Sequence, residues 1–179
     1  AHKFYGLNGI GLLIKRRNLA LEPLIHGGES TTIYRSGTPT VALASSLACA
    51  LDFAVTDLPG RVDHVAKLNA ELRAALSTYP LVRINSPDHA IPHVLNLSVR
   101  NVKGTVFQRE LDAKGVCVSV KSACSSDGLP SRAVFAVSRD RRNALSSWRI
   151  SLSHLTTEDE IKAFLQAFDV CCRELTALH

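Results

Sequence analysis

The 179-residue sequence contains no methionine. Because translation starts with methionine, we expect that this chain was processed or that it is a piece of a longer protein. The length is enough for one ordinary domain or two small ones with a buried core. Hydrophobic residues make up 46% of the sequence and charged residues 21%, which excludes a long disordered or collagen-like chain.

The sequence also lacks the cysteine patterns of a disulfide scaffold or a zinc site. Its five cysteines are an odd number and include no C-x-x-C pair, so we expect no metal site. The first residues lack the basic and then apolar layout of a signal peptide. The longest apolar stretch, 41–55, contains Asp52 and is too short to span a bilayer. These absences predict a cytoplasmic location and no membrane partner.

Positive charge is in modest excess. The sequence has 21 lysines and arginines against 16 aspartates and glutamates, a net charge of +5, which favours acidic partners. The densest basic runs, 15–17 and 139–142, lie beside apolar or acidic neighbours, and no aromatic RNA-binding signature accompanies them. We therefore interpret both runs as solvated faces and expect no direct nucleic-acid binding.

The spacing of apolar residues predicts an α/β chain whose second part is a small α+β domain. Leu58-Pro59-Gly60 interrupts the pattern, so we place a domain boundary near residue 58, between parts 1–58 and 59–179. The expected elements are a buried strand at 9–14, a buried helix from Pro39 to about Phe53, an amphipathic helix at 62–76, a strand at 94–99, a helix at 105–113, a strand at 116–120, a short helix after 130, a strand at 148–152, and a last helix that begins with a capping box of Thr157 and Glu160.

Cys124 is the strongest single candidate for chemistry. It lies in a polar segment, 121–130, after a predicted strand and close to Lys121. Exposure and a neighbouring cation favour the thiolate form that a nucleophile needs. Spacing alone leaves open the alternative of a free thiol on a surface loop. For the other cysteines, Cys49, Cys117, Cys171 and Cys172, we expect packing roles.

Two cationic residues have unusual neighbours. Lys3 lies between His2 and an aromatic residue, and a lysine in apolar surroundings can form a Schiff base with a carbonyl cofactor, although a lysine near a chain end is usually solvated. Arg149 lies in a predicted strand between Trp148 and Ile150. Such an arginine lies either on an exposed face or in a site where its planar group holds a carboxylate through two hydrogen bonds.

Several segments, taken in order, resemble the NifS-like cysteine desulfurases, which are pyridoxal phosphate-dependent enzymes of the class V aminotransferase group. The segments are His2-Lys3, Tyr5-Gly6, Gly9-Ile10-Gly11, His26-Gly27-Gly28, Arg35-Ser36-Gly37-Thr38, Val94-Leu95-Asn96-Leu97-Ser98, Val118-Ser119, Ser122-Ala123-Cys124-Ser125 and Arg149-Ile150-Ser151-Leu152. The resemblance extends to about residue 170 and corresponds to the C-terminal half of the family's architecture. It implies a remnant of the large cofactor domain in 1–58 and the small domain, with the catalytic cysteine, in 59–179.

The resemblance implies a role for each matching residue. Lys3 matches the Schiff-base lysine, His2 the adjacent phosphate-site histidine, and Thr38 a threonine that reaches the cofactor phosphate of the other subunit of a homodimer. Cys124 matches the catalytic cysteine that takes sulfur as a persulfide, and Arg149 the arginine that holds the substrate carboxylate. The implied reaction converts L-cysteine to L-alanine and passes sulfur to an acceptor protein, for iron–sulfur cluster assembly or tRNA thiolation.

The same resemblance implies that much of the cofactor site lies upstream of Ala1 in the family. We therefore expect that this chain alone neither binds pyridoxal phosphate tightly nor turns over. Two alternatives remain open within enzymes, a selenocysteine lyase and another class V aminotransferase. From a different class, the chain is a non-catalytic sulfur-relay or interaction domain in which Cys124 only accepts a persulfide from elsewhere.

Overall fold

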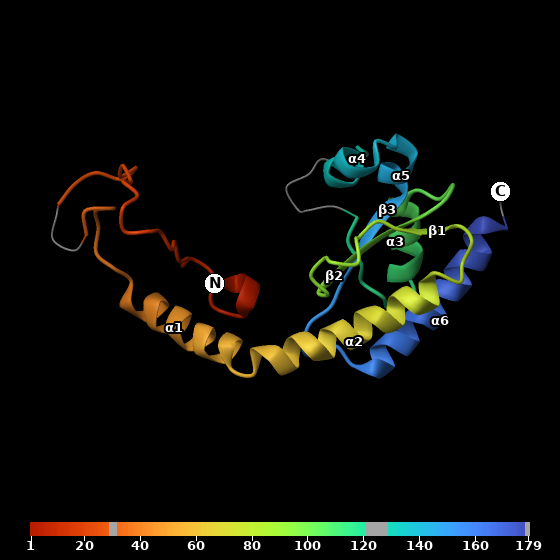
Figure 1. The fold of residues 1–179 in the computed structure, drawn as a ribbon, viewed down its shortest axis with the longest axis horizontal. Coiled ribbons are helices and arrows are strands. Elements are labelled where there is room, and N and C mark those ends of the chain that lie inside the picture. The colour runs from red at the N-terminus through yellow and green to blue at the C-terminus, as the bar shows by residue number, and fades with distance from the viewer. Residues whose placement is uncertain (29–31, 121–128, 178–179) are drawn as a thin grey trace. The chain divides into compact units, whose positions relative to one another are not determined.

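A computed structural model describes residues 1–28, 32–120 and 129–177 of the chain. These residues form two compact units, unit 1 (Ala1–Leu58) and unit 2 (Pro59–His179). All the strands that the structure describes belong to unit 2 (Figure 1). The expected mixture of helices and strands is therefore confirmed.

The described residues of unit 1 form two helices and long irregular segments. η1 (His2–Phe4) is a single 3-10 turn, and α1 (Val41–Val55) is an α-helix. The buried strand expected at 9–14 is wrong, since Leu13 and Ile14 are 76% and 85% exposed and no regular structure is assigned there. A strand buried on both faces needs partner strands and covering layers, and the described part of unit 1 offers neither.

α1 is apolar on most sides, yet none of its residues is buried. The helix begins at Val41 with Thr40 as its N-cap residue, so the start expected at Pro39 lies too early. The expected burial is also wrong, because the described residues of unit 1 contain too little packed structure to cover this helix. A helix of this composition is ordinarily buried, so α1 presents an uncovered apolar surface in this chain.

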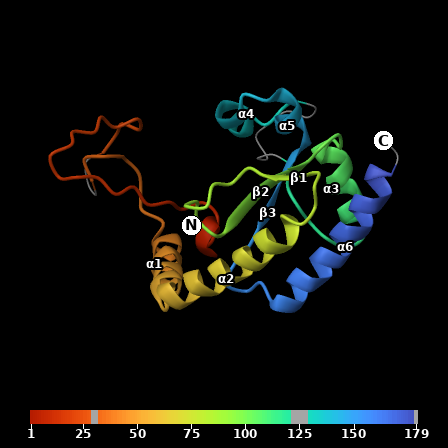
Figure 2. The ribbon, with the colours of Figure 1, turned by 45° about the vertical axis from the view of Figure 1, so that its right-hand side comes forward.

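Unit 2 is built on a three-stranded antiparallel sheet in the order β1-β2-β3. The strands are β1 (Val82–Ile84), β2 (Val94–Val99) and β3 (Ser147–Ser151). Helices α2 (Leu58–Leu76), α3 (Gly104–Asp112) and α6 (Glu158–Thr176) pack on one face, and the short helices α4 (Arg132–Ser138) and α5 (Arg141–Ser146) lie on the other side of the sheet (Figures 1 and 2). Among the described residues no single helix is long and apolar enough to cross a membrane; only α1 and α2 taken together reach that length and composition.

Alternation along the strands gives the sheet an apolar face and a polar face. Leu97 pairs with Trp148, and both belong to the core that α2, α3 and α6 cover. Asn96 pairs with Arg149, and since successive side chains of a strand point to opposite faces, these two point away from that core. The register therefore places a polar pair in the middle of the opposite face.

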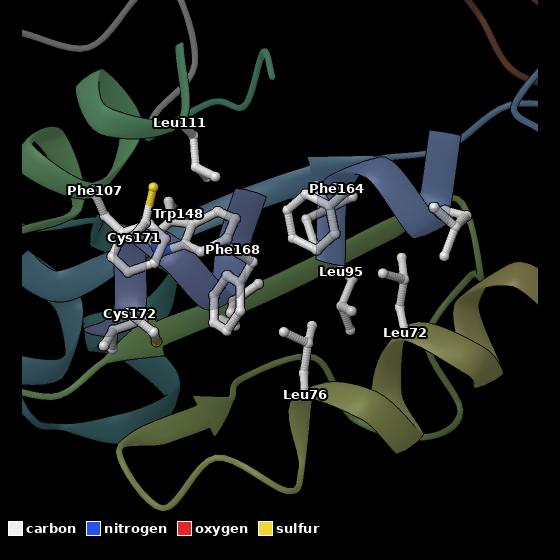
Figure 3. Close-up of a cluster of buried hydrophobic side chains, with 14 of the residues drawn as sticks. Leu72, Leu76, Leu95, Phe107, Leu111, Trp148, Phe164, Phe168, Cys171 and Cys172 are labelled. Carbon is white, nitrogen blue, oxygen red and sulfur yellow. The ribbon is translucent and has the colours of Figure 1, made fainter. Parts of the chain in front are cut away.

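The core of unit 2 is rich in aromatic rings. Trp148 is fully buried and stacks on Phe107, with ring centroids 5.1 Å apart and planes 15° apart. Phe164 and Phe168 of α6 lie beside it, with Phe168 6.1 Å from Trp148 (Figure 3). Helix α2 contributes to the same core, and its side chains, such as Leu76, point toward β2 (Figure 3). These contacts fix β3, and with it the position of Arg149.

The spacing of apolar residues and the capping motif in the sequence predicted most of the helices and strands of unit 2. The strand at 94–99 is confirmed, and so is the capping box, in which the side chains of Thr157 and Glu160 each accept a hydrogen bond from the other's backbone N–H. The amphipathic helix at 62–76 is confirmed as part of α2, but α2 begins at Leu58, so the interruption expected at Leu58-Pro59-Gly60 is wrong and the turn lies at 56–57. The strand expected at 116–120 is wrong, because the only residue there that pairs is Ser119, which bridges to Arg149. β1 was missed because three residues are too few to show a period.

Gly104 begins α3 at a close approach to the backbone of β3. A Cβ there would lie 2.5 Å from the carbonyl oxygen of Ser147, and backbone atoms cannot move aside as the end of a side chain can. We expect Gly104→Ala to lower the free energy of unfolding by about 1–3 kcal/mol, measured by urea denaturation with circular dichroism. The control is Thr105→Ala, an exposed neighbour with an expected change below about 0.5 kcal/mol. Equal urea midpoints for the two variants would contradict this packing.

Candidate functional site

The polar face of the unit 2 sheet forms one wall of a pocket of about 700 Å³. The sheet contributes Arg83, Asn96 and Arg149, and Ser119 continues the wall beside β3. The opposite side comes from the segment 129–138, which includes α4. Residues far apart in the sequence thus meet around one pocket within unit 2.

Arg149 lies in this wall, and the Nε of its guanidinium has no hydrogen-bond partner among the described residues. Its backbone exchanges hydrogen bonds of 2.7 and 3.1 Å with Ser119 on one side, and it pairs with Asn96 on the other. The Nε is also buried. Because buried polar groups are nearly always hydrogen-bonded, an arginine that lines a pocket with its Nε unpaired suits an anionic ligand, and its planar fork matches a carboxylate.

A network of amides and hydroxyls stiffens the wall behind Arg149. Asn85 Nδ2 donates to Asn96 Oδ1 at 2.9 Å and to Ser98 Oγ at 2.8 Å. Asn143 Nδ2 of α5 donates to Asn85 Oδ1 at 2.9 Å, and Ser98 Oγ donates to the Asn143 carbonyl at 3.1 Å. The network ties α5 to the sheet. Sequence reasoning missed it, although the polar residues at alternate positions of the apolar segment 94–99 were a signal of a polar face.

Capping residues set the two short helices beside the pocket. Ser131 caps α4 through its Oγ, and Asp140 caps α5 by accepting from the backbone N–H groups of Arg142 and Asn143. Asp140 also lies 3.8 Å from Arg83, whose side chain is 56% exposed. The pocket therefore has a cation at its rim in addition to Arg149.

Of the other predicted site residues, three belong to unit 1 and one lies outside the described residues. His2 and Lys3 are on η1, Thr38 precedes α1, and all three are exposed residues of unit 1. Arg149 belongs to unit 2. Cys124 lies outside the described residues, between Val120 and Leu129. The catalytic and cofactor-binding roles of these residues stay predictions.

The unit 1 residues have the right chemistry for pyridoxal phosphate but do not enclose it. An amine such as that of Lys3 can attach the carbonyl carbon, and His2 and Thr38 can donate to a phosphate. However, all three are exposed, and Lys3 stands on a helix of a single turn. The described residues of unit 1 therefore do not, by themselves, fit a held cofactor.

The four described cysteines fall into two classes. Cys171 and Cys172 of α6 are buried, whereas Cys49 and Cys117 are exposed. The expected packing role is confirmed for the first pair and wrong for the second, because α1 has no buried face and the segment 116–120 leaves Cys117 at the surface. Burial raises the pKa of both α6 thiols, that of Cys172 to about 11.

These pKa shifts predict selective reactivity and a loss of stability at high pH. At pH 8 iodoacetamide is expected to modify Cys49 and Cys117 and to spare Cys171 and Cys172 until the protein unfolds, as measured by peptide mass spectrometry.

Since burial favours the protonated thiol in the folded state, the stabilisation by Cys172 is full below pH 9.0, its ordinary pKa, and is lost as the pH rises through about 11. In the labelling experiment, equal rates for Cys172 and Cys117 in the folded protein would contradict the burial of Cys172.

Comparisons with known proteins agree on one group of relatives. The sequence profile of the family Aminotransferase class-V matches residues 1–164. The cysteine desulfurase IscS of Dictyoglomus turgidum is 31% identical over 181 residues, which cover 99% of this chain and 46% of that protein. The cysteine desulfurase IscS of Vibrio cholerae is 35% identical over 182 residues, or 99% of this chain and 45% of that protein.

Solved structures give the same result. A NifS-like protein superposes with a TM-score of 0.83 at 31% identity, and the match covers 99% of this chain and 45% of that one. A NifS-like protein from Rickettsia africae superposes with a TM-score of 0.74 at 28% identity, covering 86% and 41%. The chain thus spans less than half the length of the relatives that it matches.

Proposed function

Because this chain belongs to the class V aminotransferase family, we propose that it is the part of a cysteine desulfurase that carries the sulfur-accepting Cys124 and the substrate-binding Arg149. The relatives named above support the reaction class. The single observation that carries the proposal is the buried Nε of Arg149, which lines a pocket and has no hydrogen-bond partner among the described residues. In the whole protein, L-cysteine is converted to L-alanine while its sulfur is held as a persulfide on Cys124.

Arg149 orients the substrate in this proposal. Its fork binds the α-carboxylate through charge-assisted hydrogen bonds, which are stronger and more directional than neutral ones. Cys124 lies in the sequence between Val120 and Leu129, and both of these residues line the same pocket. This supports a site in which one end of the substrate is bound by Arg149 and the other end meets the thiolate of Cys124.

The proposal extends to the cofactor and the partners of the whole protein. Pyridoxal phosphate is its cofactor, with Lys3 as the attachment point and His2 and Thr38 at the phosphate, the latter in a homodimer. The sulfur goes to an acceptor protein for iron–sulfur cluster assembly or tRNA thiolation, in the cytoplasm. The resemblance of the segments around these residues to cysteine desulfurases supports the assignments of the cofactor and of Lys3, His2 and Thr38.

The test measures alanine and persulfide made from L-cysteine by the whole protein that carries this chain, with pyridoxal phosphate present. We expect the two products in equal amounts, and a rise in KM of about tenfold or more for Arg149→Lys, because lysine keeps the charge but lacks the planar fork. Activity on L-selenocysteine but not on L-cysteine would favour a lyase instead. An Arg149→Lys variant with unchanged KM would contradict the role of Arg149.

The 179-residue chain alone is expected to behave differently. Mixed with pyridoxal phosphate, it should give no stoichiometric visible absorption band that depends on Lys3, because the unit 1 residues are exposed. A band that Lys3→Ala abolishes would show that this chain holds the cofactor by itself and would contradict the expectation.

A further inference from the structure

Three polar side chains form a row across the pocket wall: Asn96, Arg149 and Ser119. Asn96 pairs with Arg149 across β2 and β3, and Arg149 pairs with Ser119 on its other edge. Residues directly opposite on neighbouring strands point to the same face, with their Cβ atoms about 4.5–5.5 Å apart. All three residues line the pocket, so their polar groups face the same space.

The network behind the wall determines which atom Asn96 presents. Asn85 Oδ1 accepts from Asn143, so the amide of Asn85 must direct its Nδ2 toward Asn96 Oδ1, 2.9 Å away. The oxygen of Asn96 is thereby occupied. Its Nδ2 makes no hydrogen bond to a described residue and remains available as a donor. The row thus offers an amide N–H, a guanidinium and a hydroxyl, all of which can donate.

We propose that Asn96 and Ser119 are substrate-binding residues that flank Arg149 and complete its hold on the α-carboxylate of an amino acid. The inference rests on the proposed function and names two further residues of the same site. An ionised carboxylate has about four lone-pair positions, of which the fork of Arg149 fills two. The remaining two face the donors on either side. Asn85 is a positioning residue, because it acts by fixing the amide of Asn96.

The test uses the 179-residue chain, labelled with ¹⁵N, and the thioether amino acid S-methyl-L-cysteine, which has no thiol to react. The matched ligand is 2-(methylthio)ethylamine, which lacks only the carboxylate. We expect saturable shifts of backbone resonances around the pocket and of the Asn96 side-chain amide with the amino acid alone. In Asn85→Ala the shift of the Asn96 side-chain amide is expected to shrink while the protein stays folded, a result that a purely structural role would not give.

Variants of the row give the quantitative test. Asn96→Ala and Ser119→Ala are each expected to weaken binding about tenfold, since each removes one donor to a charged group. Asn96→Asp, nearly the same shape, is expected to weaken it more, because a carboxylate replaces the donor. The control is Ser151→Ala, which also lies on β3 at an exposed position but does not line the pocket, and it should bind as the parent chain does.

The outcomes separate this inference from the proposed function. If Arg149→Ala abolishes binding while Asn96→Ala, Asn96→Asp and Ser119→Ala bind like the parent chain, the inference is overturned and the role of Arg149 stands. If the parent chain shows no shift that depends on the carboxylate, the inference is overturned as well. The proposed function is then decided separately, by alanine formation in the whole protein. Dispersed spectra of each variant establish that it is folded.

Discussion

Replacing Cys124 with serine is expected to lower sulfur transfer from L-cysteine by a factor on the order of 10³ or more. The serine hydroxyl fits the same space, but it is not ionised at neutral pH and forms no persulfide. The measurement is persulfide on the whole protein, by mass spectrometry after incubation with L-cysteine, together with sulfur passed to a thiol acceptor. The substitution leaves Arg149 and its pocket unchanged, so substrate should still bind.

Two exposed thiols provide matched controls for this variant. Cys117→Ser alters a surface thiol seven residues earlier, and Cys49→Ser alters one on α1. Both are expected to transfer sulfur at the parent rate. If Cys124→Ser kept the parent rate and Cys117→Ser lost it, the sulfur-accepting role would belong to Cys117. Full activity in all three variants would overturn the proposed use of a protein thiol.

Replacing Trp148 with alanine is expected to lower the free energy of unfolding of unit 2 by about 3–5 kcal/mol. The ring is fully buried and in contact with Phe107, Phe164 and Phe168, so the variant leaves a cavity in the centre of the core. Urea denaturation followed by circular dichroism measures the effect. An unchanged urea midpoint would show that these rings do not form the core in solution.

Trp148→Phe separates packing from polarity at the same position. The Nε1 of Trp148 is buried without a hydrogen-bond partner among the described residues, and an unpaired buried donor is destabilising. Phenylalanine keeps most of the ring contacts and removes this donor, so we expect a much smaller loss, of about 1–2 kcal/mol. A loss as large as that of the alanine variant would mean that the indole N–H is paired in solution.

Sequence reasoning succeeded where a structure depends on neighbouring residues. The capping box of Thr157 and Glu160 needs only four consecutive residues. The apolar face of the helix at 62–76 follows from the spacing of its own apolar residues. It failed where burial depends on distant partners, since the apolar segment 9–14 and α1 have the composition of buried elements but lie exposed in this chain. Hydrophobic composition shows that a segment favours burial, and only the surroundings decide whether burial occurs.

The same limit applies to the site. The position of Arg149 between Trp148 and Ile150 already implies that it points away from an apolar face. The residues beside it depend on strand register and on a bridge to Ser119, which no local pattern reveals. The orientation of the Asn96 amide depends on Asn143, which is 47 positions away in the sequence. Strand pairing therefore determines which residues lie beside Arg149 and form a site with it.

Under the proposed function, the bridge between Ser119 and Arg149 also limits how far Cys124 can carry sulfur. Ser119 is tethered to β3 by two backbone hydrogen bonds, and Cys124 follows it by five residues. A fully extended stretch of five residues spans roughly 17 Å between its Cα atoms. While the tether holds, the Cα of Cys124 therefore stays within this distance of the Cα of Ser119, and its thiol within one side-chain length more. Any acceptor must bring its receiving atom inside this range. The proposed function therefore requires that sulfur be passed on within this distance of Ser119, which lines the Arg149 pocket.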